Sequence, residues 1–521
     1  MSVNDIRFLL FVLISVIIYY VIPRRYRWMV LLTASSVFYI SNGINATAYM
    51  VMTVILTYAA SLILDRLANT KPSGETPEEK KQHKSQLKRQ KRIVLSVALL
   101  LNFLSLGVFK YSGFFVANIN GIVGYDILPI PSFLLPLGIS FYIFQTAGYM
   151  IDVMRGKYAA EHNFAKYALF TCYFPQLVQG PINRYDLIGE SLYVGNELDF
   201  TNIQAGILRM MLGILKKAMI ADVLAPAVAK IYSGYGNYPG VISFIGAALY
   251  CVQLYCDFSG GVDLLCGTSR LFGVKMMENF KQPYFALSLA DFWRRWHISL
   301  GEWMKDYLFY PLAFSSAMTK LTKKARGFLP ADIVKRITPC LCTFIVFLAV
   351  GIWQGPGWAN IAYGLWNGFW MSLGLMWVPF GAKLKDKLPQ NKIFLTVWGV
   401  IRTNFLVIIG RYFSNAYGGS FSNAVGMLKH TILSPGFSAV NAEMLSGLGL
   451  GFGVIARLIP ALAILFSISL AKEKDVDLLE WFCKRPWYVQ FVLLFFGLAL
   501  IVMGVYGNDS YTPIAYVYEN I

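Results

Sequence analysis

The sequence predicts an all-α polytopic membrane protein, with about eleven to thirteen transmembrane helices and further re-entrant or interfacial helices. Of its 521 residues, 56% are hydrophobic and only 14% are charged, and the mean hydropathy is +0.53. A soluble globular protein has a more polar composition. Apolar windows long enough to cross a hydrocarbon core of about 30 Å also recur from one end of the sequence to the other.

Twelve windows are candidates for membrane spans. They cover residues 6–22, 28–42, 45–65, 93–116, 128–151, 203–232, 239–257, 335–353, 358–379, 393–413, 447–471 and 487–506. The segment 167–182 is too short and too rich in proline and glycine to span, so we expect a re-entrant piece buried in protein. Polar residues interrupt the apolar helices mainly in the middle of the chain, which predicts one membrane domain (1–521) with a core in 126–380 and flanking helices in 1–125 and 381–521.

Basic loops set the expected orientation of the chain. Arg24, Arg25 and Arg27 follow the first apolar stretch in place of a small-residue cleavage site, which predicts a retained helix. The loop 66–92 carries nine Lys or Arg residues against three Glu, and two predicted spans separate it from the first cluster. Both loops then lie in the cytoplasm and the N-terminus lies outside. We expect 66–92 to be a solvated connector, with docking of an acidic carrier protein as the alternative.

The net charge of +18 does not predict nucleic-acid binding. The basic residues sit in short loops between spans, where positive-inside bias and anionic membrane lipids account for them. No groove-reading module accompanies the charge. The seven cysteines have a spacing that fits neither a disulfide framework nor a metal site, so most are expected to be small buried hydrophobic residues.

The densest chemistry lies in the segment DFWRRWHISLGEWMKDYLFYP, residues 291–311. Ionisable residues are costly in a bilayer unless they face a cavity, a partner or the interface, so this cluster predicts a functional site. Arg294, Arg295 and Trp296 precede His297, and the other three histidines lie outside such a charged and aromatic setting. An imidazole here is a candidate acid or base, or a residue that orients an acceptor; the alternative is a satisfied buried group.

Two further segments place amide side chains among apolar residues. Gln145 lies in PLGISFYIFQTAGYMID, where small and amide residues also serve to hold helices together in lipid. Gln179 lies in FPQLVQGPINR, residues 174–184. Its prolines and glycine leave backbone groups unpaired at membrane depth, which is tolerated where protein or a cavity satisfies them, and we expect this segment to line a cavity.

The segment YCDFSGGVDLLCGTSRLFG places two carboxylates, Asp257 and Asp263, around Ser259. The carboxylates have four open roles: they hold Arg294 or Arg295, orient a polar acceptor, bind a cation, or form structural ion pairs. No set of additional ligands supports a metal site.

In GIWQGPGWANIAYGLWNGFW, residues 351–370, Gln354 follows Trp353 and stands thirteen residues before Asn367 on a broken helix. The two amide side chains are placed so that both can face one cavity. They donate and accept hydrogen bonds, but neither takes a proton from a nucleophile.

Taken together, these five segments resemble, in order and spacing, the membrane-bound O-acyltransferase family, in the branch of alginate O-acetyltransferase and teichoic-acid D-alanyltransferase. FxQxxxGPxxR, RRWHxSL and the ending AYVYENI are similar to the polysaccharide-acetylating subgroup. The resemblance implies a ring of helices around a thinned centre with a funnel or tunnel. It also implies a thioester donor from the cytoplasm, either acetyl-coenzyme A or an acyl group on a carrier protein's phosphopantetheine arm, and an acceptor hydroxyl reached from the outer side.

One position departs from the family. Relatives normally read Trp-His-Gly where this chain has Trp353, Gln354 and Gly355, and that histidine is regarded as catalytic; at Asn367 many relatives carry a second histidine. Three explanations are open: an engineered inactive variant, a natural enzyme whose base is His297, or a member that has lost acyl transfer. We favour the first, because an exchange of His for Gln keeps size and hydrogen bonding while it removes titration.

The sequence therefore predicts a bacterial cytoplasmic-membrane O-acyltransferase that passes an acyl group, with acetyl favoured, to a cell-envelope or exported polysaccharide. His297 would orient or deprotonate the acceptor and Gln354 would occupy the catalytic position. No metal or bound cofactor is expected. The residues expected to bind substrate are Asn367, Arg295, Arg294, Asp257, Ser259, Trp353, Trp296, Gln179 and Gln145. The alternatives are aminoacyl transfer to teichoic acid from a carrier protein, a transporter or flippase, and a non-catalytic partner that holds an acyl donor for an extracytoplasmic transferase.

Overall fold

The computed structural model describes residues 3, 5–131, 133, 135–385, 391–414, 420–506 and 514–516. Within these ranges the chain is helical and contains no β-strand; an isolated antiparallel bridge joins Phe280 and Trp296. The expected all-α class is confirmed. Of the seven cysteines, Cys483 is half-buried and the other six are buried, and none forms a disulfide.

Several helices are long and apolar enough to cross a membrane, so the chain is a multi-pass membrane protein. Within the described ranges there are six of them: Ile44–Asn69, Pro77–Val123, Gly240–Leu271, Ala331–Gln354, Lys392–Arg411 and Phe452–Glu473. This is fewer than the roughly eleven to thirteen spans expected from window length. Some of the other apolar windows hold shorter helices: Ile6–Val21 has 16 residues, and the helix in 128–151 begins only at Ile139.

The chain divides into two compact units. Unit 1 comprises Met1–Ile207, Leu265–Met277 and Tyr518–Ile521, and unit 2 comprises Leu208–Leu264 and Glu278–Val517. The helices α10 (Phe200–Lys216) and α12 (Gly240–Leu271) contribute residues to both. The division of the membrane domain at residues 125 and 380 stays a prediction.

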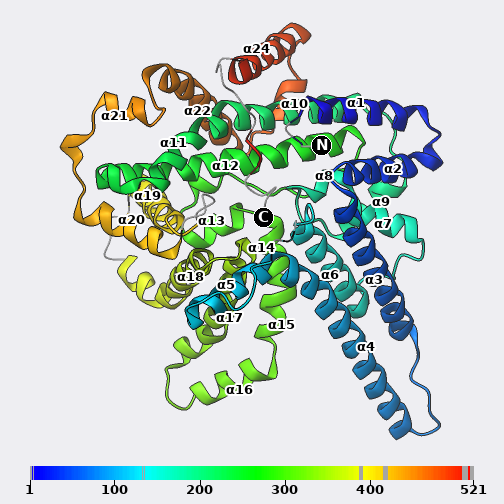
Figure 1. The fold of residues 1–521 in the computed structure, drawn as a ribbon. Coiled ribbons are helices and arrows are strands. Elements are labelled where there is room, and N and C mark those ends of the chain that lie inside the picture. Colours follow the sequence, from blue (N-terminus) through cyan, green and yellow to red (C-terminus); the bar gives the residue numbers. More distant parts are fainter. Residues whose placement is uncertain are drawn as a thin grey trace. The chain divides into compact units, whose positions relative to one another are not determined.

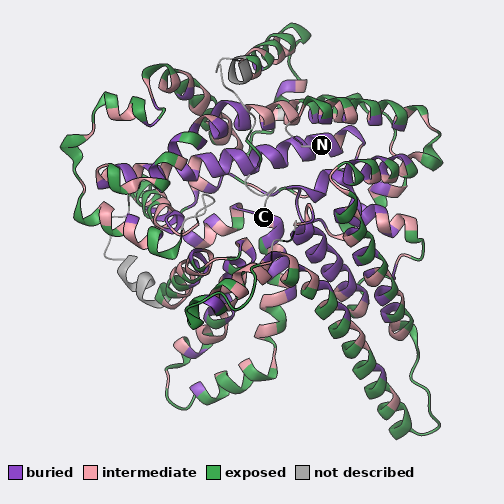
Figure 2. Cartoon of the chain, in the orientation of Figure 1, coloured by how far each residue is buried: buried purple, intermediate pink, exposed green. Residues whose placement is uncertain are grey.

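Unit 1 is built around three neighbouring helices, α3, α4 and α6, which run side by side (Figure 1). Its elements are α1 (Ile6–Val21), η1 (Arg24–Tyr26), α2 (Arg27–Ile40), α3 (Ile44–Asn69), α4 (Pro77–Leu106), η2 (Gly107–Tyr111), α5 (Ser112–Val123), α6 (Ile139–Arg155), α7 (Phe164–Cys172), α8 (Phe174–Leu177) and α9 (Tyr185–Tyr193). The helix α6 is buried over nearly its whole length (Figure 2). Asn102 on α4 donates hydrogen bonds of 3.2 Å to the Ile143 carbonyl and to Thr146 Oγ1 on α6, a polar link of the kind that holds helices together in lipid.

The basic stretch that was expected to be a connector is largely helical. Thr76 and Glu79 form a capping box, and Pro77 occupies the first turn, so α4 begins at residue 77 and continues through the basic run. The side chains of this run are mostly exposed. The irregular connector is therefore short, and the positive charges lie on an exposed helix.

The segment 174–184 has the broken, protein-enclosed backbone expected of a re-entrant piece. After α8 the chain is non-helical to Arg184, and residues 174–183 are all buried. Asn183 ties this backbone down: it donates to Gln176 Oε1 at 3.2 Å and accepts from the Met277 backbone at 3.0 Å. Gly180 permits the tight turn, because a Cβ there would lie 2.4 Å from the Gln176 Cα.

Unit 2 holds the remaining helices, together with the part of α10 from Leu208 onward and the part of α12 up to Leu264. They are η3 (Lys217–Ala221), α11 (Asp222–Ser233), η4 (Tyr235–Asn237), η5 (Pro283–Phe285), α13 (Leu289–Arg295), α14 (Ile298–Met304), η6 (Lys305–Phe309), α15 (Tyr310–Ala313), α16 (Ser316–Ala325), α17 (Ala331–Gln354), α18 (Trp358–Lys385), α19 (Lys392–Arg411), α20 (Phe421–Leu433), η7 (Phe437–Ala439), α21 (Ala442–Gly447), α22 (Phe452–Glu473), α23 (Leu478–Cys483) and α24 (Trp487–Tyr506).

The helices α17 and α18 form a tight antiparallel pair joined by a short loop (Figure 1). Two glycines allow their close approach. A Cβ at Gly351 would lie 2.7 Å from the Gly364 Cα, and one at Gly364 would lie 2.5 Å from the Phe347 carbonyl oxygen. This crossing fixes the last turn of α17, which carries Trp353 and Gln354.

Substitution Gly351→Ala should therefore destabilise the protein, by about 1–3 kcal/mol as in overpacked cores, because backbone atoms of α18 must move. Gly374→Ala is the matched control on α18: no atom lies within 4 Å of a Cβ there, and the helix gains propensity. Thermal unfolding in detergent measures both. Equal unfolding temperatures for the two variants would contradict the close crossing.

Candidate active site

His297 lies in the turn between α13 and α14, with its backbone in the left-handed region at φ 48° and ψ 53°. This conformation is uncommon for a residue other than glycine, and the surrounding structure must hold it in place. Two backbone hydrogen bonds do so: the Ile298 N–H donates to the Asn279 carbonyl at 3.0 Å, and the Lys281 N–H donates to the Arg295 carbonyl at 2.9 Å. The turn directs the imidazole inward, where His297 is 1% exposed.

Asn279 sets the protonation pattern of this imidazole. The backbone N–H and the hydroxyl of Ser299 both donate to Asn279 Oδ1, at 3.1 and 2.9 Å. Because a backbone N–H can only donate, the oxygen of the amide must face Ser299 and His297. His297 Nδ1 lies 3.2 Å from the same oxygen, so it carries the proton in this bond. In the neutral ring Nε2 then holds the lone pair that can accept a proton.

The imidazole is enclosed by aromatic rings. Phe258 presents its ring at 4.9 Å, edge to face, and Trp353 lies at 5.7 Å between ring centroids. Burial away from water lowers the pKa of His297 from 6.5 to about 3, because the charged form loses its hydration. The ring is therefore neutral at physiological pH, in the form that can accept a hydrogen bond or a proton at Nε2.

Trp353 brings the last turn of α17 to this ring. Gln354 is the next residue and ends the helix, with its side chain half-buried. Asn367 on α18 is buried and already engaged: its Oδ1 accepts from Trp293 Nε1 at 3.1 Å, and its Nδ2 donates to the Tyr363 carbonyl at 2.8 Å. Asn367 thus links α18 to α13, the helix that precedes His297.

A buried arginine, which the sequence analysis did not single out, lies beside Trp296. The Arg411 guanidinium sits over the Trp296 ring, 5.0 Å from its centroid, and is 2% exposed. Its Nη1 donates to the Tyr363 hydroxyl at 3.2 Å and to Ser414 at 3.3 Å. Within the described ranges no carboxylate forms an ion pair with it. Its only signal in the sequence was its place near the end of the apolar window 393–413. An arginine at such a place is usually interpreted as a residue at the membrane–water interface.

Arg294 and Arg295 both form ion pairs with carboxylates. Both bind Asp291 at 3.1 Å, and Arg295 also binds Glu473 on α22 at 2.6 Å. The Arg294 side chain is 72% exposed, while that of Arg295 is largely buried. Arg295 therefore fastens α13 to α22.

The carboxylates of α12 bind lysines, so the idea that they hold Arg294 or Arg295 is wrong. Lys217 bridges Asp257 and Asp222, the latter at 2.9 Å. Lys216 binds Asp263 at 2.6 Å and donates to Ser259 at 3.2 Å. Structural ion pairing, one of the four roles left open, is what the geometry supports. In the described part of the chain no three His, Cys, Asp or Glu side chains gather in a way that could hold a metal ion.

Gln145 and Gln179 belong to unit 1. Gln145 donates to the Phe170 carbonyl at 3.0 Å, which fits a role in holding helices together. Gln179 is 0% exposed, and neither amide atom has a hydrogen-bond partner among the described residues. Such a group carries a desolvation cost of about 1–3 kcal/mol, so Gln179 remains a candidate for contact with substrate.

Comparison with known proteins identifies the family. The family model for membrane-bound O-acyltransferases matches residues 81–328. A probable alginate O-acetylase of Pseudomonas putida is 32% identical over 474 residues, which cover 87% of this chain and 85% of the relative. The chain belongs to the membrane-bound O-acyltransferase family.

Two other relatives define the branch. A probable alginate O-acetylase of Azotobacter vinelandii is 33% identical over 68% of this chain and 65% of its own length. A teichoic acid D-alanyltransferase of Streptococcus thermophilus is 28% identical over 53% of this chain and 68% of its own length. The expected family and branch are confirmed, and membership makes this membrane protein an enzyme of the O-acyltransferase class.

Substitution Asn279→Ala in this O-acyltransferase should release the tautomer of His297, because the acceptor that selects Nδ1–H is lost. Asn279→Asp keeps an acceptor oxygen and should retain the Nδ1–H form. Solid-state NMR with ¹⁵N-labelled histidine reads the tautomer directly, and His297→Gln assigns the signal. An unchanged Nδ1–H signal in Asn279→Ala would show that another group selects the tautomer.

Acid should destabilise the folded O-acyltransferase through His297. The unfolded chain binds a proton at this residue near its ordinary pKa of 6.5, whereas the folded chain binds it only near 3. The contribution of His297 to stability is therefore fully present above about pH 6.5 and is lost as the pH falls toward 3. Unfolding temperatures of the protein and of His297→Gln, measured from about pH 8 to pH 4, test this. Equal acid sensitivity in the two proteins would contradict it.

Proposed function

We propose that this chain is a membrane O-acyltransferase built to transfer an acetyl group from a cytoplasmic thioester to a hydroxyl of a cell-envelope or exported polysaccharide, and that Gln354 makes the present form inactive. Its place is the cytoplasmic membrane of a bacterium, with the N-terminus outside. The observation that carries the proposal is the buried, neutral His297, fixed by Asn279 and in ring contact with Trp353. The alginate O-acetylase relatives suggest a polysaccharide as the class of acceptor.

In the proposed reaction the acceptor hydroxyl oxygen attacks the thioester carbonyl carbon, and the bond from carbon to sulfur breaks. A general base takes the hydroxyl proton and passes it to the departing thiolate, so that an ester and a thiol result. The orientation of the His297 ring suits the positioning of the attacking hydroxyl, because Nδ1 is held by Asn279 and Nε2 carries the lone pair that can accept a hydrogen bond. The donor is acetyl-coenzyme A or the phosphopantetheine arm of a carrier protein.

The environment of His297 favours a positioning role over that of the main base. Burial lowers its pKa to about 3, and a base this weak gains little from proton transfer near neutral pH. The histidine that the family resemblance implies at the position of Gln354 would supply the stronger base. This supports the explanation in which the present chain is an engineered inactive variant, with Gln354 in place of the catalytic histidine.

Substitution Gln354→His should therefore raise acetyl transfer by about 100-fold or more, the usual contribution of a general base. Proteoliposomes with labelled acetyl-coenzyme A or labelled acetyl carrier protein, and a polysaccharide acceptor, measure the product ester. Gln354→Asn is the matched control, since it offers another amide that cannot titrate. No gain from Gln354→His over Gln354→Asn would defeat the inactive-form explanation.

Aminoacyl transfer to teichoic acid is the second candidate, favoured by the exposed basic run at the start of α4 and by the D-alanyltransferase relative. An acidic carrier protein would dock on such a helix through opposite charge. Copurification of an acidic carrier that is lost when Lys88 and Lys91 are both changed to Glu would support this candidate. Transfer from acetyl-coenzyme A alone would count against it.

A further inference from the structure

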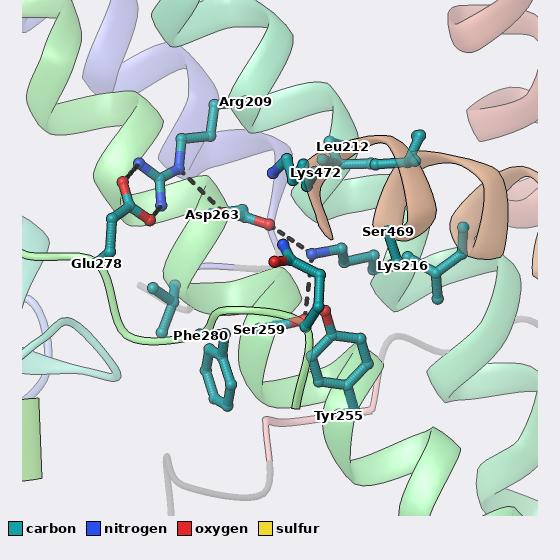
Figure 3. A pocket seen from close by; sticks show the side chains of 14 residues that line it. Arg209, Leu212, Lys216, Tyr255, Ser259, Asp263, Glu278, Phe280, Ser469 and Lys472 are labelled. Atoms are coloured by element: carbon teal, nitrogen blue, oxygen red, sulfur yellow. Dashed lines mark hydrogen bonds and ion pairs between the residues drawn. The ribbon is translucent and has the colours of Figure 1, made fainter. Parts of the chain in front are cut away.

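Three adjoining cavities in unit 2 combine a charged compartment with two apolar ones. The charged cavity has a volume of about 30 Å³ and is lined by side chains of α10, α12 and α22, among them Arg209, Lys216 and Lys472 (Figure 3). One buried water needs roughly 10–15 Å³ on this scale, so the space equals two or three waters, about the size of a phosphate group.

The charges around this cavity do not balance. Arg209 binds both carboxylate oxygens of Glu278 at 2.6 Å and Asp263 at 3.0 Å, and Lys216 binds Asp263 at 2.6 Å (Figure 3). Lys472 also lines the cavity, and in the described part of the chain it forms neither a hydrogen bond nor an ion pair. Three cations thus face two carboxylates, which leaves one positive charge for a bound anion.

A neutral hydrogen-bonding group in the same cavity, the side chain of Gln282, also has an atom without a partner among the described residues. Gln282 lines the charged cavity and the larger apolar one, and its Oε1 is buried without a partner in the described ranges. Its backbone is held at φ 42°, a strained conformation for glutamine. Ser469 lines both cavities one turn before Lys472, so its hydroxyl and the ammonium group face the same space.

The apolar cavities extend from the charged one along α22. The larger has a volume of about 250 Å³ and shares Tyr255, Leu465 and Ser469 with it, and the smaller, of about 50 Å³, reaches Ala461. Lys472 is the second-last residue of this span-length helix. Ala461 lies eleven residues earlier, about 16 Å along the axis at 1.5 Å per residue, or roughly half of the hydrocarbon thickness.

We propose that these cavities bind one anionic phospholipid, with its phosphodiester at Lys472, Lys216 and Ser469 and its acyl chains along α22. A phosphodiester brings one negative charge, which neutralises the one positive charge in excess. The arrangement of charges at the end of a span and apolar space along its length matches the polarity profile of a lipid. A free phosphate would fill the charged cavity and leave the apolar ones unexplained. The proposal stands independently of acyl transfer.

Binding to the purified full chain tests this site. Native mass spectrometry and thermal unfolding in neutral detergent compare dioleoylphosphatidylglycerol, dioleoylphosphatidylcholine and inorganic phosphate. Phosphatidylglycerol should be retained and should raise the unfolding temperature more than the other two probes. Lys472→Gln should weaken phosphatidylglycerol binding about five-fold, since one lysine at a lipid head contributes about 1 kcal/mol. Lys474→Gln, an exposed lysine two residues away that does not line the cavities, should leave binding unchanged.

A second variant keeps every charge in place. Ser469→Leu fills the junction of the charged and the larger apolar cavity, and it should also reduce retention of the lipid, even if Lys472→Gln fails to fold. Equal binding by Lys472→Gln and Lys474→Gln would overturn the proposal. So would stabilisation by inorganic phosphate equal to that by phosphatidylglycerol, which would reveal a site for free anions, or equal retention of phosphatidylcholine, which would reveal no selection by charge.

Discussion

The hydrogen bonds to the side-chain carbonyl of Asn279 are the constraint on which the candidate active site depends. This one oxygen receives the backbone N–H and the hydroxyl of Ser299 and faces Nδ1 of His297. The Ser299 backbone determines which way the amide points, and the amide in turn determines the tautomer of the imidazole. Backbone hydrogen bonds between residues 279–281 and residues 295–298 hold the left-handed turn at His297. The backbone geometry of His297 and the protonation of its ring therefore both depend on the pairing of these two segments.

Several buried charged side chains of this protein form ion pairs with side chains of opposite charge. Lys217 is surrounded by two aspartates, and Asp263 by Lys216 and Arg209, so that charges removed from water retain partners. Arg411 and Lys472 depart from this pattern, because the described carboxylates do not pair with them. Arg411 lies over the aromatic rings of Trp296 and Tyr363. Lys472 lines the charged cavity that adjoins the two apolar ones. Uncompensated cations of this kind mark places where a ligand can supply the missing charge.

The sequence predicted the helical membrane class and the family, because apolar windows and the spacing of motifs are local properties. Burial of the segment 167–182, of which residues 169–182 are all buried, also followed from its short length and its prolines and glycine. The partners of the site residues did not follow. Asn279 lies 18 residues from His297, and Lys217 lies 40 residues from Asp257, and only tertiary packing brings them together. The helical start of α4 was missed because its charge concealed the capping box of Thr76 and Glu79.

The most direct test of the central claim is the position of a bound donor. A cryo-electron microscopy map of the protein with a non-hydrolysable acetyl thioester analogue would locate the reacting carbonyl. The account predicts the carbonyl carbon beside Nε2 of His297 and the side chain at position 354, with room for an acceptor oxygen at about 3–3.5 Å. A carbonyl bound elsewhere, with His297 still sealed among Phe258 and Trp353, would contradict it.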